Sequence, residues 1–379
     1  MHSAFQVKSI LRCTWFAYLL TQLILYKAWT PNRIFPTVTV FSVVRNLPEE
    51  SPLILYAATV VLTLVLLWKP LWKTGIVLWI GLVVLSFGFD FVFWQPYTYF
   101  FLAIVILHFF SSTSDIFWAR FLLILSPLYI FSGLHKINGA FLYSVWDTYF
   151  LHKLLGITAV DSYFVYFHYA GLFVGMIEIL IGLGLLFQRT RIWAFRGLIS
   201  IHLLIILGLS PIGLFSNAIV VPWNVLLLVV SFTGCYLPKD CIYLYRWQLE
   251  YKKHLFFIIY FWLVPIFGFF GYYNMYFSFD LYSGKGKSMY IVYNNPNDCP
   301  ESVKPFLYQR KIENKNYWVV SPTSWCKREL NLLLPKDDYI LHSFAIAYIG
   351  KYPKSNGRFY ITTYPFTSEV SYWMKIGLN

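Results

Sequence analysis

The residues best suited to chemistry are a histidine and a lysine at the end of an apolar segment. Residues 117–131 carry a single charge, Arg120, and lead into Ser132–Gly139, with the sequence SGLHKING. An ionisable pair at the end of a membrane-length segment is costly to hold out of water, so His135 and Lys136 form a functional-site hypothesis. In a partly dry site the ammonium form of Lys136 is disfavoured, and its neutral amine becomes a base. The alternative is that Lys136 snorkels to the membrane surface.

Two further ionisable residues lie in apolar surroundings. Glu178 is in residues 171–187 and His202 is in residues 197–209, both otherwise almost wholly apolar. A carboxylate in such a place pairs with another group, lines water or stays protonated. Each residue alone could make a helix–helix hydrogen bond. Together with Lys136 they favour a polar pocket in which Glu178 and His202 orient a ligand or the lysine, with His135 tuning the amine.

The composition is that of a membrane protein. Of 379 residues, 58% are hydrophobic and only 12% are charged, whereas soluble domains carry about 25% charged residues. The net charge of +13 is explained by cationic loops that flank spans and by a basic C-terminal region, so we expect no nucleic-acid partner. The spacings typical of metal sites, phosphate-binding loops and Ser/His/Asp triads are absent from the sequence, and we expect no metal.

Apolar runs of membrane length predict an all-α polytopic bundle of about nine spans. These runs are residues 11–29, 52–68, 74–94, 97–113, 117–136, 163–187, 193–210, 212–234 and 255–272. Residues 141–157 are too charged to span and predict an interfacial or re-entrant helix that contains Trp146. The Lys and Arg residues of the short loops are concentrated on one side, which places the N-terminus in the cytoplasm and the C-terminal region outside.

The character of the chain changes after residue 272. We therefore predict a transmembrane domain over residues 1–272 and a small β-rich extracytoplasmic domain over residues 273–379. Alternating patterns with β-branched and aromatic residues predict strands at 288–293, 317–320, 339–348 and 358–363. An oxidising compartment permits a disulfide between Cys299 and Cys326, although two free thiols are the alternative.

The aromatic residues of segment 87–101, Tyr97 among them, have two interpretations. Tryptophan and tyrosine at span ends usually form interfacial belts. The same rings could instead form the wall of a site for a flat apolar ligand such as a quinone.

The segment Ser132–Asn138, followed by Trp146, resembles the motif of the vitamin K-dependent γ-carboxylase family. Residues 169–187, Thr190-Arg191, Ile201-His202 and 212–216 are similar to that family in order and approximate spacing. The resemblance covers roughly residues 5–275 and indicates the HTTM (horizontally transferred transmembrane) domain that the γ-carboxylase shares with bacterial relatives. In this comparison His135 stands where the family has a second lysine, next to the one at the position of Lys136. Residues Trp94–Tyr97 stand where the family has a histidine.

The resemblance implies quinone-dependent chemistry at the outer face of the membrane. Lys136 would deprotonate reduced vitamin K or another quinol, with carbon dioxide and oxygen as co-substrates and a secreted or membrane protein as substrate. The alternative function is a non-catalytic membrane scaffold or a quinone-linked accessory protein. A transporter ranks last, because the prolines do not define matched broken helices in two halves of the chain.

Overall fold

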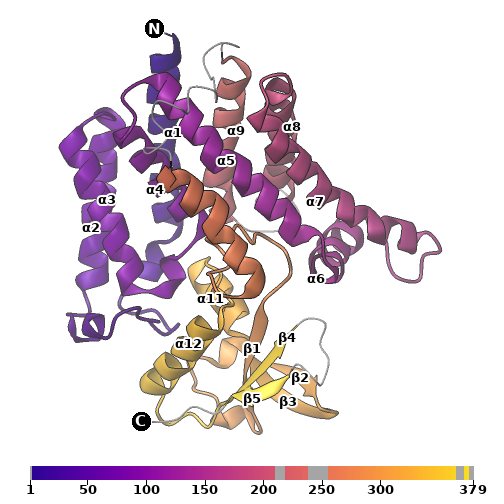
Figure 1. The fold of residues 1–379 in the computed structure, drawn as a ribbon. Helices are drawn as coiled ribbons and strands as arrows, with labels where there is room; N and C mark the ends of the chain where they lie inside the picture. Colours follow the sequence, from indigo (N-terminus) through magenta and orange to yellow (C-terminus); the bar gives the residue numbers. More distant parts are fainter. Residues whose placement is uncertain (1, 210–217, 238–254, 364–370, 375–379) are drawn as a thin grey trace. The chain divides into compact units, whose positions relative to one another are not determined.

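The computed structural model describes residues 2–209, 218–237, 255–363 and 371–374 (Figure 1). These residues fold into two compact units. The first unit comprises residues 1–21, 60–81 and 96–284, and the second comprises residues 22–59, 82–95 and 285–379. The predicted motif at 212–216 lies outside the described residues.

The chain is mostly helical before residue 285. Its longer helices are α1 (His2–Ile24), α2 (Ser51–Trp68), α3 (Lys73–Phe89), α4 (Pro96–Phe109), α5 (Ser114–Lys136), α7 (Phe164–Leu186), α8 (Arg191–Leu209) and α9 (Val221–Cys235). Short 3₁₀ helices lie at Tyr26–Trp29, Ser42–Asn46, Phe91–Phe93, Ala218–Val220, Val264–Phe270, Pro296–Asp298 and Lys304–Phe306.

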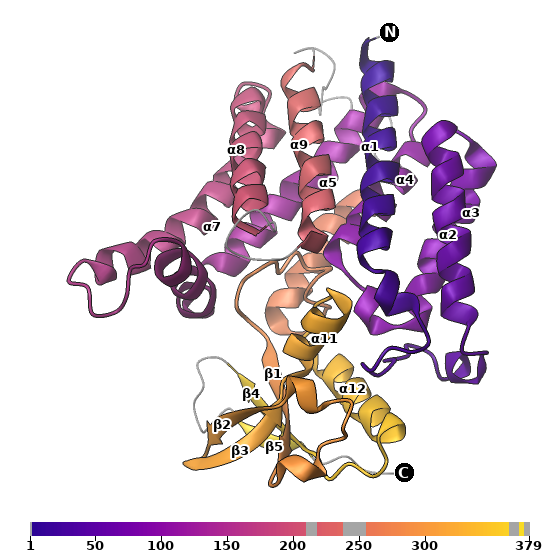
Figure 2. The same ribbon diagram turned by 180° about the vertical axis from the view of Figure 1, so that it is seen from behind.

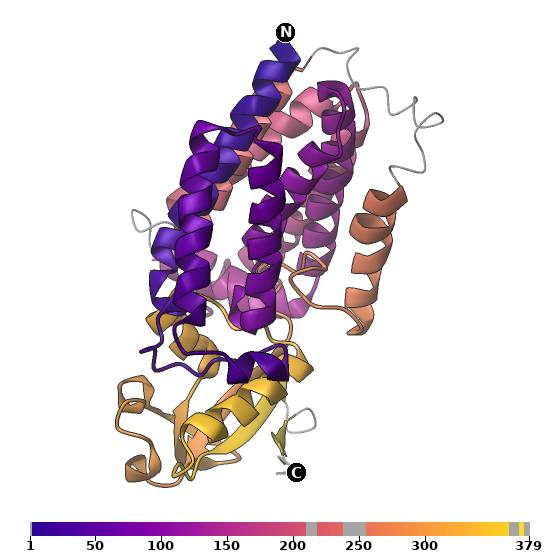
Figure 3. The same cartoon turned by 90° about the vertical axis from the view of Figure 1, so that its left-hand side faces the viewer.

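Five helices of the described residues are long and apolar enough to cross a membrane. They are α2, α5, α7, α8 and the segment Ala218–Cys235, which contains α9. Helices α3, α4 and Leu255–Phe270 are apolar but shorter; the last of these is the orange helix in Figure 3. These helices support an integral membrane protein and coincide with most of the predicted apolar runs.

Helix α5 is the most buried of the five candidate membrane helices among the described residues. It begins at Thr113, whose hydroxyl accepts a hydrogen bond from the backbone N–H of Ile116, and it ends with His135 and Lys136 in its last turn. The Thr113 hydroxyl satisfies a free backbone N–H at the start of the helix, and the basic side chains lie near the partial negative charge at its end. Its most apolar 18-residue stretch is 83% buried, against 28% for α7. Helix α5 therefore contacts protein on nearly all sides, whereas α7 exposes most of its surface.

Helix α7 packs along α5 (Figure 1), and the contact is made by a stripe of glycines. The buried residues of α7 include Gly171, Gly175, Glu178 and Gly182, which the helical period places on one face. A Cβ added at Gly175 would lie 2.7 Å from the carbonyl oxygen of Gly133, and one at Gly182 would lie 2.8 Å from that of Ser126. Small residues let the two backbones approach this closely.

The segment expected to form an interfacial or re-entrant helix is helical. After the single turn of α6 (Gly139–Phe141), residues Leu142–Leu154 form a π-helix, and Asn138 caps the segment by accepting from the N–H of Phe141. π-Helices are rare and are frequently found at functional sites. Another π-helical turn spans Ile259–Leu263.

The second unit contains an antiparallel five-stranded sheet of order β2-β3-β1-β4-β5 (Figure 2). The strands are β1 (Lys287–Tyr293), β2 (Tyr308–Ile312), β3 (Lys315–Val320), β4 (Arg358–Thr363) and β5 (Tyr372–Met374). Helices α11 (Pro322–Leu330) and α12 (Asp338–Lys351) belong to the same unit. The predicted strands at 288–293, 317–320 and 358–363 are confirmed as β1, β3 and β4.

The predicted strand at 339–348 is wrong, because these residues form α12. The buried residues of α12 are Ile340, Leu341, Phe344, Ala345 and Tyr348. Their spacing of three to four residues is that of a helix face, although the aromatic and β-branched content resembles that of a strand.

The second unit draws on residues well before the predicted boundary at 272/273. Arg33 donates to the carbonyl of Ala28 and pairs with the buried Asp90. The carboxylate of Glu329 accepts from the backbone N–H groups of Ile34 and Phe35. Segment 22–59 is therefore bonded to α11, far from it in sequence.

The expected disulfide is not formed. Cys299 and Cys326 are both free and buried. Cys299 follows a 3₁₀ turn and its Sγ lies 3.7 Å from the carbonyl oxygen of Pro300, whereas Cys326 is on the buried face of α11.

Candidate functional site

Lys136 makes a buried ion pair with Glu178. Its Nζ lies 2.7 Å from Oε2 of Glu178 and 2.6 Å from the hydroxyl of Ser132, one turn earlier on α5. Lys136 is 6% exposed and Glu178 is 8% exposed. The lysine therefore does not snorkel to a surface, and the geometry brings together two of the residues predicted from the sequence.

The glycine stripe positions this pair. Glu178 lies between Gly175 and Gly182 on the buried face of α7, and the Cβ atom of Lys136 would be 3.3 Å from a Cβ at Gly175. Because the backbones of α5 and α7 nearly touch, the two long side chains meet over a short distance in an apolar surrounding. Breaking such a buried pair by removing one partner leaves an uncompensated charge and is strongly destabilising.

His135 faces a different part of the first unit. Consecutive helical residues point about 100° apart, so Lys136 faces α7 while the His135 ring lies on Phe269, with ring centroids 4.0 Å apart and planes at 9°. Its Nδ1 is 3.7 Å from Oδ2 of Asp280. Asp280 was not among the residues predicted from the sequence, although it is the one carboxylate between Glu250 and Asp298 and lies in an aromatic segment.

His202 belongs to a second polar cluster. Its Nε2 is 2.5 Å from the hydroxyl of Tyr129, and its Nδ1 is 2.8 Å from Oδ1 of Asn224. These contacts join α8 to α5 and to α9. Tyr129 lies two turns before Lys136 on α5, so it shares a side of that helix with the lysine. The structure places His202 near Tyr129 and Asn224, and no hydrogen bond of the described residues joins it to Lys136.

Trp146 and Tyr97 both lie in helices that pack against other helices. The indole N–H of Trp146 donates to the carbonyl oxygen of Phe167 at 2.8 Å, and its ring would contact a Cβ at Gly171 at 2.6 Å. Trp146 therefore holds the π-helix against the start of α7. Tyr97 is buried in the first turn of α4, a helix that packs on α5.

A second acid–histidine pair joins the π-helix to α7. Nδ1 of His168 lies 2.8 Å from Oδ2 and 3.0 Å from Oδ1 of Asp147, and the ring of Tyr143 packs on the imidazole. The sequence signal was present, since both residues are ionisable and border an apolar segment. Their pairing depends on the π-helix, which the periodicity did not indicate.

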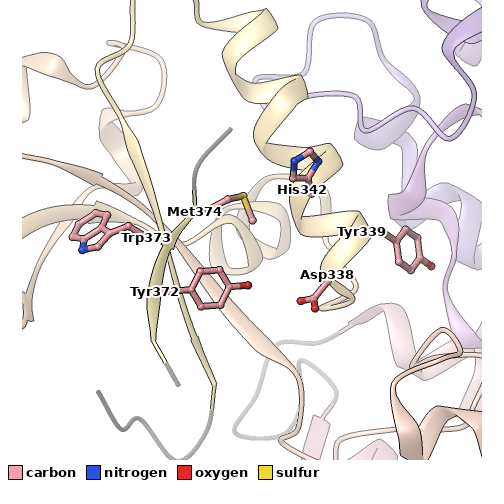
Figure 4. Close-up of a pocket in the computed structure, with 6 residues that line it drawn as sticks. All are labelled: Asp338, Tyr339, His342, Tyr372, Trp373 and Met374. Atoms are coloured by element: carbon pink, nitrogen blue, oxygen red, sulfur yellow. The ribbon is translucent and has the colours of Figure 1, made fainter. Parts of the chain in front are cut away.

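The second unit has its own hollow, shown in Figure 4. This open groove of about 520 Å³ is lined by Asp338, Tyr339, His342, Tyr372, Trp373 and Met374. Lys287 pairs with Asp338 at 2.7 Å and lies beside it. Among the described residues, no group of three His, Cys, Asp or Glu side chains gathers as a metal site would require.

No protein family, curated protein or solved structure matches this chain. Function is therefore inferred from the site itself. The Lys136 amine and the Glu178 carboxylate, 2.7 Å apart and both buried, form a charge-assisted hydrogen bond. A lysine amine is one of the side-chain groups that act in general acid–base chemistry.

Proposed function

We propose that this chain is an integral membrane protein in which Lys136 is a base toward a quinol-like ligand, in chemistry like that of the γ-carboxylase. The observation that carries this proposal is the burial of the Lys136 amine against Glu178 at 2.7 Å. Intramembrane ionisable residues are expensive to bury and by default indicate function. The sequence resemblance at Ser132–Asn138 and Trp146 points to the same lysine.

The chain's own residues suit a flat, weakly acidic ligand. At the end of α5 that contains Lys136, Phe131 and His135 pack on the ring of Phe269, and aromatic surfaces of this kind suit flat rings. A bound quinol supplies an acidic hydroxyl. Lys136, as the neutral amine, would take up that proton at Nζ and become the ammonium, which the Glu178 carboxylate would pair with through Oε2. Carbon dioxide and oxygen would then be the co-substrates, and a glutamate of a secreted or membrane protein the acceptor.

The proposal includes a topology of nine spans with a cytoplasmic N-terminus. Its support is the concentration of Lys and Arg on one side of the predicted spans. The C-terminal sheet domain would then be extracytoplasmic. Cysteine labelling from one side of sealed vesicles tests this, with new cysteines at the exposed positions Tyr26 and Trp68 labelled from opposite sides. Labelling of both positions from the same side contradicts it.

A non-catalytic scaffold is the second candidate, favoured by the glycine stripe. Backbone contact along Gly133, Gly175 and Gly182 shows that this helix pair is built for packing, and an ion pair within it can serve to fix register. In that case Lys136 would have no ligand.

The decisive experiment is mass identification of lipid-soluble ligand that copurifies with the protein. We expect a quinone from the wild type and at least tenfold less from Lys136→Met/Glu178→Gln, which removes the amine and leaves no lone buried carboxylate. Lys153→Met is the matched control, because Lys153 is exposed on the π-helix. Equal quinone content in all three proteins, with unchanged quinol-dependent turnover, would favour the scaffold.

A further inference from the structure

Residues 271–284, here named the strap, fold onto the end of α5. Nδ2 of Asn138 donates to the carbonyl oxygen of Ser283 at 3.5 Å. At Gly284, with φ +73°, an added Cβ would overlap the hydroxyl of Ser144 and lie 2.7 Å from the carbonyl carbon of Ala140. Glycine is required here both for its backbone conformation and for the close approach. The strap is therefore fastened to the chain just beyond Lys136.

The strap also has a defined internal structure. The side chain of Asn274 accepts from the N–H groups of Tyr276 and Phe277, and the hydroxyl of Ser278 donates to the Asn274 carbonyl at 2.7 Å. Phe279 is fully buried and its ring stacks on Phe261. This arrangement fixes the path of the chain on both sides of Asp280.

Two residues that flank Asp280 have strained backbones. Phe279 has φ 60° and Tyr282 has φ 56°, in the left-handed region that bulky residues rarely adopt. Such conformations are unfavourable and persist where the surroundings impose them, often at functional sites. Here they place the carboxylate between them in the interior, with Asp280 only 7% exposed.

Asp280 faces the imidazole beside Lys136. Its Oδ2 is 3.7 Å from Nδ1 of His135, an ion-pair distance, and such contacts at catalytic groups often tighten when a ligand binds. A carboxylate on one ring nitrogen determines which nitrogen carries the proton. An apolar residue would fill this space without the cost of burying a charge.

We propose that Asp280 is a positioning residue of the Lys136 site: the strap holds its carboxylate on Nδ1 of His135, so that the proton is on Nδ1 and Nε2 is the unprotonated nitrogen of the imidazole next to Lys136. This inference rests on the proposed function for its ligand. The geometry it predicts for the histidine does not, because the tautomer exists without any ligand.

The test is nuclear magnetic resonance of the full chain labelled with ¹⁵N-histidine, at a pH where the imidazoles are neutral. The His135 signal is identified by its loss in His135→Gln. We expect the Nδ1–H tautomer in the wild type, a change to mainly Nε2–H in Asp280→Ala, and return of Nδ1–H in Asp280→Glu. Asp147→Ala is the matched control at the other acid–histidine pair and should alter His168 alone. An unchanged His135 tautomer in Asp280→Ala, or an equal change in Asp147→Ala, overturns the proposal.

A second pair of variants tests the strap with Asp280 intact. Gly284→Ala forces the strap away from Ala140 and Ser144 and should shift His135 towards Nε2–H, as Asp280→Ala does. Gly271→Ala has a similar positive φ of +75° but no atom within 4 Å of its added Cβ, so it should leave the tautomer unchanged. The same tautomer in both variants contradicts the strap's role. None of these readouts needs quinol or turnover, so they fail or succeed independently of the proposed function.

Discussion

At the level of single residues, the Lys136–Glu178 pair is a stability liability as well as a candidate site. Lys136→Met should lower the free energy of unfolding by about 3–5 kcal/mol, because Glu178 is then a buried charge without its lysine. The double variant Lys136→Met/Glu178→Leu should recover most of the loss. Thermal unfolding in detergent measures both changes.

The comparison of single and double variants separates the two roles of the pair. A double variant as unstable as the single one would mean that the apolar side chains do not pack in the site. If Lys136→Met lowers the free energy of unfolding by less than about 1 kcal/mol, water reaches the pair more readily than the burial of Lys136 and Glu178 indicates.

The two buried cysteines of the second unit, Cys299 and Cys326, are expected to be unreactive at neutral pH. Burial raises the pKa of the Cys299 thiol to about 11 and that of Cys326 well above its usual value, and the thiolate is the nucleophile. Because the pKa of each thiol is higher in the folded than in the unfolded protein, the folded state favours the neutral thiols. Their contribution to the free energy of unfolding is complete below pH 8.5 and is lost as the pH rises towards 11.

Thiol labelling tests this in a chain whose other cysteines are replaced by serine. At pH 8 the native protein should react with an aromatic disulfide reagent at least a hundredfold more slowly than the denatured protein. In the denatured, unreduced protein two thiols, those of Cys299 and Cys326, should react with the reagent. One or no thiol would indicate the disulfide that the sequence permits.

At the level of elements, the glycine stripe of α7 determines how closely α5 and α7 approach. Gly175→Val places atoms where the Gly133 carbonyl and Lys136 Cβ lie, and overpacking of this kind typically costs 1–3 kcal/mol. Gly208→Val on α8 is the matched control, since nothing lies within 4 Å of its added Cβ. The temperature of thermal unfolding should be lower for Gly175→Val than for the wild type and should change little for Gly208→Val. Equal effects would mean that helix propensity alone decides the outcome.

The sequence predicts the helices of the first unit better than the contacts between them. Apolar runs located α2, α5, α7 and α8, because membrane length is a one-dimensional signal. The partner of Lys136 was within reach, since Glu178 is a rare charge in an apolar run. Asp280 was not considered, because its relation to His135 depends on two left-handed residues that no periodicity encodes. The α12 helix was missed because its aromatic residues outweighed its helical spacing.

At the level of the whole molecule, the second unit is discontinuous in sequence. Phe35 packs between Trp325 and Phe344, with ring centroids 5.1 and 5.3 Å away. Lys351 and Tyr352 donate to the carbonyls of Arg33 and Ile34. A change in composition at residue 272 could not reveal this, because segments 22–59 and 82–95 are read as loops and span ends when taken in order along the chain.

The fragment 285–379 should therefore not fold alone. Without residues 33–35, Trp325 loses the ring of Phe35, and the half-buried carboxylate of Glu329 loses two backbone N–H donors and keeps the indole N–H of Trp325. A lost hydrogen bond to a charged group costs about 1.5–3 kcal/mol. We expect the isolated fragment to unfold in urea without a cooperative transition and to show the tryptophan emission of exposed indoles.

A single chain that joins residues 22–59, 82–95 and 285–379 through flexible linkers should regain a cooperative transition and blue-shifted emission. In that chain Phe35→Ala should lower the free energy of unfolding by about 3–5 kcal/mol. Cooperative unfolding of the isolated 285–379 fragment would show instead that the sheet and its two helices form an independent domain to which the earlier segments merely attach.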